Sequence, residues 1–420
     1  MTVTERQAAA SGPEQERSAA RRRFARGRSL EPIALPVTWL VVIILFSILR
    51  PDVFPTTANA ASILSSQAVL VVLTLGVLAP LTVGDLDVSA ASVVGLSAMV
   101  LVILTANLHV NVVLAVVVTI ACASLVGLLN GVCSAFLGLD TLIVTLATGS
   151  LVAGITAWIS DNNTITGLSQ VIVQLVVADH FLGVSLEFYY GLALCLIVFY
   201  LLRYTPLGRR MLIVGQARDV AWLSGINVRR VRMGSLVFCA TLAGLAGVLY
   251  AGTSGSAEPA GGTELLLPAY AAAFLGATTI TPGRFNPFGS FIAVYFLVTG
   301  ITGLQLLGAQ NYVQQIFYGA ALLIAVTVSI LVKRSPRAKT ATAAGEGPSL
   351  SSGRGAVTSS TSCSRVACRA PVLLKVREHD VDEVLAGRGH PVGPVSEGYR
   401  HVQLNVAERY GDHPVVEPGP

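Results

Sequence analysis

Charged residues are scarce in this sequence, and lysine is the scarcest of them. Only 12% of its 420 residues are charged, whereas 53% are hydrophobic; a typical soluble domain has about 25% charged residues. All three lysines lie at or beyond the last long apolar segment, at Lys333, Lys339 and Lys375. Repeated continuous apolar runs of about 20 residues predict a helical membrane protein. A transmembrane β-barrel would instead show short alternating segments.

Motifs that carry enzyme chemistry are missing. The chain has no G-x-x-x-x-G-K-[ST] nucleotide loop, no G-x-S-x-G or H-E-x-x-H motif and no Cys/His cluster. Four of the six cysteines lie in or beside apolar runs, where cysteine behaves as a small hydrophobe; Cys363 and Cys368 lack zinc-ligand spacing. The chain is therefore predicted not to be an enzyme and to bind no metal or cofactor itself.

Ionisable residues are absent from the centres of the apolar segments. Such residues usually mark proton relays and ion-coupled carriers. Their absence weakens the interpretation as a proton-coupled secondary transporter, while sodium coupling through backbone carbonyls stays open. The pattern suits a pathway for a neutral polar solute that is driven from outside the membrane part.

Ten apolar segments predict an all-α polytopic membrane protein with about ten transmembrane helices. The segments are Ile33–Leu49, Ile63–Val83, Ala90–Thr105, Val110–Leu129, Leu142–Ser160, Phe188–Leu202, Gly234–Ala251, Leu266–Ile280, Phe288–Leu304 and Val313–Val332. The third, sixth and eighth are short for a hydrocarbon core of about 30 Å, which leaves three alternatives for each: a broken helix, a re-entrant helix or a helix extended by polar residues.

The distribution of basic residues predicts the topology. With the N-terminus inside and ten spans, the inner flanks hold nineteen basic residues and the outer flanks only Arg50, as the positive-inside rule requires. An even number of spans and cytoplasmic N- and C-termini follow. The excess positive charge thus reports topology and not a nucleic-acid surface.

Composition divides the chain into three parts. Residues 1–30 form a basic cytoplasmic tail, and residues 31–332 form the transmembrane domain with a cytoplasmic loop at 203–234. The first part of residues 333–420 is rich in Ser, Thr, Gly and Pro, and the segment is expected to be disordered cytoplasmic sequence. No function is assigned to this last part.

The segment Arg203–Arg232 carries seven arginines and one acid, Asp219, between two long apolar runs. Thr205 followed by Pro206 predicts a helix start. Arg218, Trp222 and Ile226 are spaced i, i+4, i+8, with Ala221, Trp222 and Gly225 as a small apolar face and the glycine as a stop. A short amphipathic helix at the membrane face is predicted. It would bind either lipid headgroups or a soluble partner.

Two polar stretches interrupt the apolar background on the inner side. In Val83–Ser92, Asp87 and Ser89 either cap the third helix or line a gate or solute pathway. In Leu129–Ser150, Asn130 and Gly131 predict a turn. Thr145 and Thr148 share a face of the fifth helix, where they either pack helices together or line a pathway. The candidate pathway residues are thus Asp87, Ser89, Asn130, Thr145 and Thr148.

Two further stretches carry structural predictions. Leu275–Phe291 contains the turn signals Pro282-Gly283 and Asn286-Pro287 on the same side as Val83–Ser92, which suggests a weak internal repeat. The outer loop Asp161–Glu187 contains the apolar run Val171–Val177, too short to span, which is expected to pack along the membrane surface or under a partner.

Taken together, these stretches resemble the permease family of bacterial sugar ABC importers of the ribose, xylose, arabinose and galactoside type, over roughly residues 36–332. GDLDVSAAS resembles that family's GGIDLSVGS, and LNG…LIVTLATGS resembles NG…FIVTLGTMS. TPLGRRMLIVGQARDVAWLSGINVRRVR resembles TxFGRxxYAVGGNxxAAxLSGINVxRVK, and LGATTITPGRFNPFGS resembles LGGTSLSGGRGSVLGT. The chain departs from these motifs at Asp85, Ala91, Gln216, Asn286 and Pro287.

The resemblance implies a permease homodimer or heterodimer in membrane lipid, with a separate ABC ATPase subunit inside and an extracytoplasmic solute-binding protein outside. ATP and Mg would bind to the ATPase. Nine residues match the family's ATPase-facing segment, and Arg218 and Asp219 complete the predicted coupling set. The nine are Gly208, Arg209, Gly215, Ala221, Leu223, Ser224, Gly225, Ile226 and Asn227.

The function that follows is import of a monosaccharide or similar polar solute, with the energy supplied by another chain. The alternative is a stand-alone secondary transporter or channel for a neutral solute, whose transport would depend on ion gradients and not on ATP. A membrane enzyme or scaffold is a third reading, but it needs a constellation of reactive groups that the sequence does not show.

Overall fold

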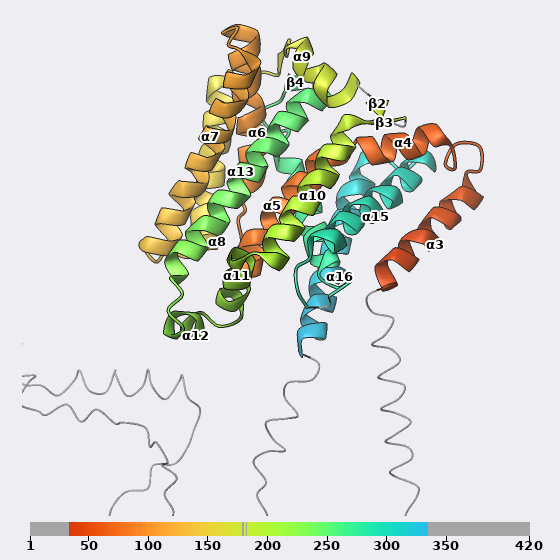
Figure 1. Cartoon of the computed structure of the whole chain (residues 1–420). Coiled ribbons are helices and arrows are strands. Elements are labelled where there is room, and N and C mark those ends of the chain that lie inside the picture. Colours follow the sequence, from red (N-terminus) through yellow and green to blue (C-terminus); the bar gives the residue numbers. More distant parts are fainter. Residues whose placement is uncertain (1–32, 179, 182, 282, 335–420) are drawn as a thin grey trace, which may run out of the picture. The chain divides into compact units, whose positions relative to one another are not determined.

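The computed structural model describes residues 33–178, 180–181, 183–281 and 283–334, and most of them are helical (Figure 1). The predicted all-α polytopic class is confirmed. The predicted tails lie outside the described residues, apart from the first two residues of 333–420.

The helices follow one another with short connections. The first half contains α3 (Ala34–Leu49), α4 (Thr57–Ser65), α5 (Ala68–Val83), α6 (Ala90–Val102) with the π-helical turn η2 (Ile103–Asn107), α7 (Val112–Gly131) with the π-helical turn η3 (Val132–Phe136), and α8 (Thr141–Ile159). The second half contains α9 (Gln170–Val173) with the π-helical turn η4 (Gln174–Ala178), α10 (Leu186–Tyr204), α11 (Pro206–Gln216), α12 (Arg218–Leu223), α13 (Val228–Ser254), the 3₁₀ turn η5 (Thr263–Leu265), α14 (Leu266–Gly276), α15 (Pro287–Leu306) and α16 (Asn311–Arg334).

Each of the ten predicted apolar segments coincides with a helix. Among the described residues, eight helices are long and apolar enough to cross a membrane, and two apolar helices, Ala34–Leu49 and Thr263–Gly276, are shorter. The third and sixth segments, predicted to be short, reach spanning length because their helices continue to Asn107 and Tyr204. The eighth segment remains short, as predicted.

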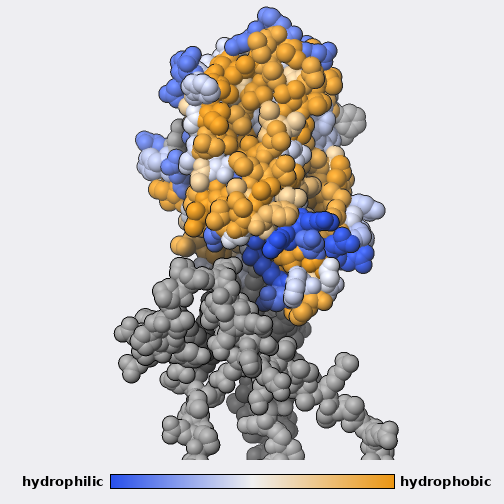
Figure 2. Space-filling model, turned by 90° about the vertical axis from the view of Figure 1, so that its left-hand side faces the viewer, coloured by the Kyte–Doolittle hydropathy of each residue, from blue (hydrophilic) through white to orange (hydrophobic). Residues whose placement is uncertain are grey.

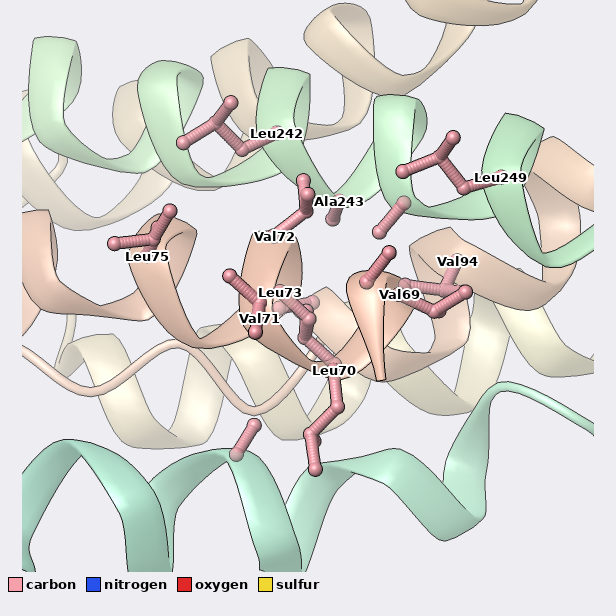
Figure 3. Close-up of a cluster of buried hydrophobic side chains, with 14 of the residues drawn as sticks. Val69, Leu70, Val71, Val72, Leu73, Leu75, Val94, Leu242, Ala243 and Leu249 are labelled. Atoms are coloured by element: carbon pink, nitrogen blue, oxygen red, sulfur yellow. The ribbon is translucent and has the colours of Figure 1, made fainter. Parts of the chain in front are cut away.

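Helix α5 lies at the centre of the bundle. Fifteen of its sixteen residues are buried, so neighbouring helices and not lipid cover a helix that is apolar on every face. Helices α10, α13 and α14 pack around it. Figure 3 shows α5 side chains such as Val72 beside Leu242 and Ala243 of α13.

Small residues bring α13 close to its other neighbours. A Cβ atom at Gly247 would lie 2.6 Å from the Cβ of Ser97 on α6, and one at Gly127 of α7 would lie 2.6 Å from the Cβ of Ala240. Glycines at such crossings let helix backbones approach closely, which is the usual means of packing helices within a bilayer.

Two short ladders lie at the end of the bundle remote from α11 and α12 (Figure 1). Strand β1 (Ile165–Thr166) pairs with β4 (Ser256–Ala257), and β2 (His180–Phe181) pairs with β3 (Val184–Ser185), both antiparallel. Between them, the predicted surface run 171–177 forms α9 and η4. Its Ile172 and Val176 are buried, and Val176 packs against Gly252 of α13. This run therefore covers its own bundle.

The turn predicted at Asn130 and Gly131 is wrong. Both residues are helical, and α7 continues through η3 until Gly138, whose φ of 76° makes the turn instead. Gly131 is needed for packing, since a Cβ atom there would lie 2.6 Å from the Cγ of Met233. The Asn-Gly pair thus serves a helix crossing and not a chain reversal.

Candidate functional site

Helix α11 is fixed against the ends of two spanning helices. It begins at Pro206 as predicted, although the Thr205 hydroxyl donates to the carbonyl of Leu201 and does not cap α11. Glycine is required at two predicted coupling positions, because a side chain at Gly208 would collide with the backbone of Leu202, and one at Gly215 with the carbonyl oxygen of Thr82. Because the chains touch there, α11 cannot move without disturbing α5 and α10.

Helix α12 has the predicted form of a short helix stopped by glycine. Gly225 has a φ of 77°, in the left-handed region that favours glycine. Its amide donates to the carbonyl of Trp222, and the Ile226 amide donates to that of Ala221. Ala221 is fully buried in a small apolar cluster with Val83 and Val214, so α12 packs on the end of the bundle by one residue.

The other apolar residues of α12 face away from the bundle. Trp222 is 71% exposed, Leu223 76% and Val220 56%. The predicted apolar face of Ala221, Trp222 and Gly225 is therefore divided, with only Ala221 turned inward. An exposed tryptophan and leucine on a six-residue helix outside the spanning segments form a surface suited to a partner.

Positive charge surrounds this apolar surface. Six arginines between 203 and 232 are exposed, and Arg232 is partly buried. Figure 2 shows a hydrophilic patch toward the lower end of an otherwise largely hydrophobic face. A hollow of about 630 Å³ opens beside α12. It is lined by Ala135, Arg218, Asp219, Trp222, Gly225, Ile226, Asn227, Val228, Arg229 and Arg232.

One buried carboxylate ties α12 and α13 to the α5–α6 loop. Oδ1 of Asp85 lies 2.9 Å from an Nη atom of Arg218, and Oδ2 lies 2.7 Å from Nε of Arg232. A second Arg232 nitrogen lies 3.0 Å from Oδ1. The Asp85 side chain is only 4% exposed and that of Arg232 14%, so water screens this pair weakly.

Neighbouring hydroxyl and carbonyl groups complete the network. The Thr141 hydroxyl at the start of α8 lies 3.1 Å from Oδ1 of Asp85 and 2.7 Å from Arg232. Arg232 also donates to the carbonyl of Ser134 in η3, at 3.4 Å. The ends of α5, α7, α8, α12 and α13 thus meet at one carboxylate.

A second polar cluster lies deeper in the bundle, two residues further along the same loop. The Asn130 amide donates to the Ser89 hydroxyl at 2.8 Å, and this hydroxyl donates to Oδ1 of Asp87 at 2.6 Å. The Tyr270 hydroxyl of α14 accepts from the Asp87 amide and donates to its carbonyl. Asp87, Ser89 and Asn130 are fully buried. Asp87 Oδ2 and Asn130 Oδ1 have no hydrogen-bond partner among the described residues.

The environment of Asp87 disfavours its charged form. Burial raises the pKa of Asp87, and hydrogen bonds from Ser89 only partly oppose this effect. Although the sequence places no acid at the centre of a span, the fold buries this one inside the bundle. Ser89 is the N-cap residue of α6, but its side chain makes no capping hydrogen bond, so the predicted cap at Ser89 is wrong. Asp87 instead accepts from the Ser89 amide at the start of this helix.

The two candidate threonines are also buried. Thr145 accepts from the Val88 amide and lies beside the carbonyl of Leu86, so it holds the α5–α6 loop. Thr148 is 8% exposed and donates to its own helix at Val144. The structure thus joins four of the five candidate pathway residues in one loop-holding contact set and leaves Thr148 beside it. Their role in a pathway stays a prediction.

Sequence reasoning missed Asp85, Thr141, Arg232 and Tyr270 as members of these networks. One signal was available for the ion pair: the inner ends of the spans contain many arginines and few acids. Asp85 was noted only as a departure from a glycine. No signal indicated Tyr270, because its partner is distant in sequence. Within the described part of the chain, no group of three or more His, Cys, Asp or Glu residues is placed to hold a metal ion.

Comparison with known proteins identifies relatives along most of the chain. The D-allose transport system permease of Escherichia coli K12 is 29% identical over 298 residues, which cover 70% of this chain and 90% of the relative. The ribose import permease of Bacillus subtilis is 30% identical over 287 residues, covering 68% and 88%. The L-arabinose ABC transporter permease of Azospirillum brasilense is 29% identical over 290 residues, covering 69% and 85%. No solved structure matches.

The family comparison agrees with these relatives. The family described as "Branched-chain amino acid transport system / permease component" matches residues 59–326, from α4 to α16. That range includes the spanning helices from α5 onward and the α11–α12 segment. The chain is a multi-pass protein of the bacterial inner membrane, and it belongs to this family of transport-system permease components.

Proposed function

We propose that this chain is the membrane-spanning subunit of an ABC importer that carries a monosaccharide or similar polar solute into the cell. Its curated relatives include import permeases for D-allose, ribose and L-arabinose. A permease for autoinducer 2 in Salmonella paratyphi A is 27% identical, so the solute class extends to sugar-like signals.

The observation that carries the mechanism is the exposed face of α12. We infer that Trp222 and Leu223, 71% and 76% exposed, dock on a separate ATPase that binds ATP and Mg. The predicted coupling residues support this role because Gly208 and Gly215 fix α11 while Gly225 ends α12. An extracytoplasmic solute-binding protein and a second permease subunit complete the transporter. Residues 203–234 act as the coupling loop of the permease domain 31–332.

The energy of ATP binding and hydrolysis on the partner ATPases reaches the permease as a movement of α12. ATP binding closes the partner ATPases, which shifts the helix that they hold. The shift alternates access through the bundle, and the differential contacts of the two ATPase states drive it.

Solute uptake by right-side-out membrane vesicles tests the proposed function. Radiolabelled ribose, allose and arabinose are offered with the solute-binding protein, and either ATP is depleted or an uncoupler is added. We expect uptake to stop on ATP depletion and to survive the uncoupler. Uptake that stops with the uncoupler and ignores ATP depletion would show a stand-alone secondary carrier instead.

Retention of the ATPase tests the docking surface separately. Trp222→Ala removes a large exposed aromatic side chain, and such interface anchors contribute about 2 kcal/mol or more. We expect at least about tenfold weaker binding of the ATPase. Trp158→Ala on α8 is the matched control, because Trp158 is 78% exposed on a spanning helix. Equal retention by both variants would remove α12 from the docking surface.

A further inference from the structure

The short helix α12 has few connections to the bundle. Its buried side chain is Ala221, and Arg218 reaches the α5–α6 loop through an Nη atom that lies 2.9 Å from Asp85 and 3.5 Å from the carbonyl oxygen of Gly84. A six-residue helix has little stability of its own. Its position therefore depends on these contacts and on its covalent neighbours.

We propose that Asp85 is a positioning residue that transmits movement of α12 to the buried polar cluster around Asp87. Its carboxylate holds Arg218 of α12 and Arg232 of α13 at the same time. This inference rests on the proposed docking of α12 on an ATPase, and it adds the route by which that docking reaches the helix bundle.

The ion pair between Asp85 and Arg232 is the stronger of the two that Asp85 forms. Both contacts of Arg232 with Asp85 are 3.0 Å or shorter, and its side chain is 14% exposed. Arg218 forms the weaker pair, because its side chain is 46% exposed and water screens the contact more strongly. In this proposal, Asp85 keeps its ion pair with Arg232 of α13 when α12 moves. The movement of α12 reaches the Asp85 carboxylate through Arg218.

Hydrogen bonds restrain the backbone of the loop that carries Asp85, so a displacement of Asp85 also moves its neighbours. The Asp85 amide donates to the carbonyl of Pro80 at 2.9 Å. The Asp87 backbone is held on both sides by the Tyr270 hydroxyl, at 3.0 and 2.9 Å. The Val88 amide donates to Thr145 at 3.2 Å. A displacement at Asp85 therefore reaches α8 and α14 within three residues.

The buried cluster has spare hydrogen-bonding capacity that a shift could use. Asp87 Oδ2 and Asn130 Oδ1 are buried acceptors without a partner among the described residues. Unpaired buried acceptors are unfavourable, so an arrangement that brings a donor to either oxygen would be competitive in energy. Such a pair of arrangements is what a transmitted movement requires.

Hydrogen exchange of the detergent-solubilised permease tests the tie without ATPase or solute. Arg218→Gln frees α12 but leaves Asp85 paired with Arg232, so the chain is expected to fold. Asp85→Asn weakens both ends. We expect the amides of residues 220–226 to exchange about tenfold faster in both variants, the effect of losing a charge-assisted contact. Arg210→Gln on exposed α11 is the matched loss of charge and leaves this exchange unchanged.

The coupling ratio tests transmission. In reconstituted transporter, we expect Asp85→Asn to raise the ATP hydrolysed per solute imported, and Asp85→Glu, which keeps the charge, to restore part of the coupling. Asp161→Asn, which removes an exposed carboxylate from the opposite end, retains the wild-type ratio.

Three results would overturn parts of this scheme, and they are distinguishable. Unchanged exchange in both Arg218→Gln and Asp85→Asn overturns the tie, whatever the transport assay shows. Faster exchange with an unchanged coupling ratio overturns its role in transmission. Absence of ATP-dependent uptake by the wild-type transporter overturns the proposed function, while the exchange result still decides whether Asp85 positions α12.

Discussion

Asp85 and Asp87 are separated by one residue and have opposite surroundings. Asp85 is paired with two arginines at the end of the bundle. The oxygens of Asp87 meet only uncharged donors or no donor among the described residues. Burying an unpaired charge is costly unless the group takes up a proton. The loop therefore holds one carboxylate for its charge and the other for its hydrogen bonds.

We predict that Asp87 makes stability depend on pH. Burial raises its pKa in the folded protein above the ordinary value of the unfolded chain. The protonated form then stabilises the fold at low pH, and this contribution is lost as pH rises through the raised pKa. Thermal unfolding of wild type and Asp87→Asn should be followed between about pH 4 and pH 8.

The midpoint of wild type should fall relative to Asp87→Asn as pH rises. Asp52→Asn, which removes an exposed carboxylate from the connection between α3 and α4, is the control and should run parallel to wild type. Parallel curves for Asp87→Asn as well would show that Asp87 is not the group responsible.

At the scale of residues, the sequence located the important segments but not the contacts. Glycine at 225 was predicted to end a helix, and its left-handed backbone confirms this. Asp85 appeared only as an unusual residue in a loop, because its two partners lie 133 and 147 positions away. Pairing over such separations depends on how the helix ends assemble, which periodicity does not encode.

The α12 turn is an element whose geometry depends on one residue. Among the described residues, no atom beyond the chain neighbours of Gly225 lies within 4 Å of a Cβ atom placed there, so a side chain at this position meets strain and not a clash. Gly225→Val forces a β-branched residue into the left-handed region, at a cost of about 1–3 kcal/mol. Asparagine tolerates that region much better.

We therefore expect Gly225→Val to loosen α12 and raise ATP consumption per imported solute, with normal insertion into the membrane. Gly225→Asn should keep much more of the wild-type coupling, because its backbone strain is small. Insertion is checked by the amount of chain in the membrane fraction. The same loss in both variants would point to the missing glycine surface itself and not to backbone strain.

The elements were predicted from apolar runs, and the errors came from helix ends. The segments at 90 and 188 are short as apolar runs, and the helices reach spanning length because polar residues such as Asn107 and Tyr204 extend them, one of the predicted alternatives. The packed apolar part of each helix fixes the direction of its axis, so the polar residues at its end continue the same helix. Asn-Gly is a turn signal only where the chain is free to reverse, and at 131 the packing against Met233 decides otherwise.

At the scale of the whole molecule, the arginine segment and the outer ladders lie at opposite ends of the bundle (Figure 1). The positive-inside rule places the arginines in the cytoplasm. We predict that Asn163→Cys, beside β1, reacts with a membrane-impermeant maleimide in intact cells. Leu223→Cys on α12 should react only after the cells are opened.

The unsubstituted chain provides the background of its native cysteines in this experiment. Labelling of both variants in intact cells would place an even number of spans between the two positions, instead of the single span α10, and would require the helices to be reassigned. The count of ten helices rests on α3 and α14, which are shorter than the rest, and labelling on both sides of each would test it.

The burial of α5 has a consequence for inheritance. A helix that neighbouring helices cover on every side cannot line a solute pathway. In a single chain, α5 therefore borders no channel. If the solute passes between two copies of the chain, an inactive copy spoils every pair that it enters. A coupling-defective allele such as Gly225→Val should then be dominant over wild type in the same cell, whereas an allele that fails to insert should be recessive.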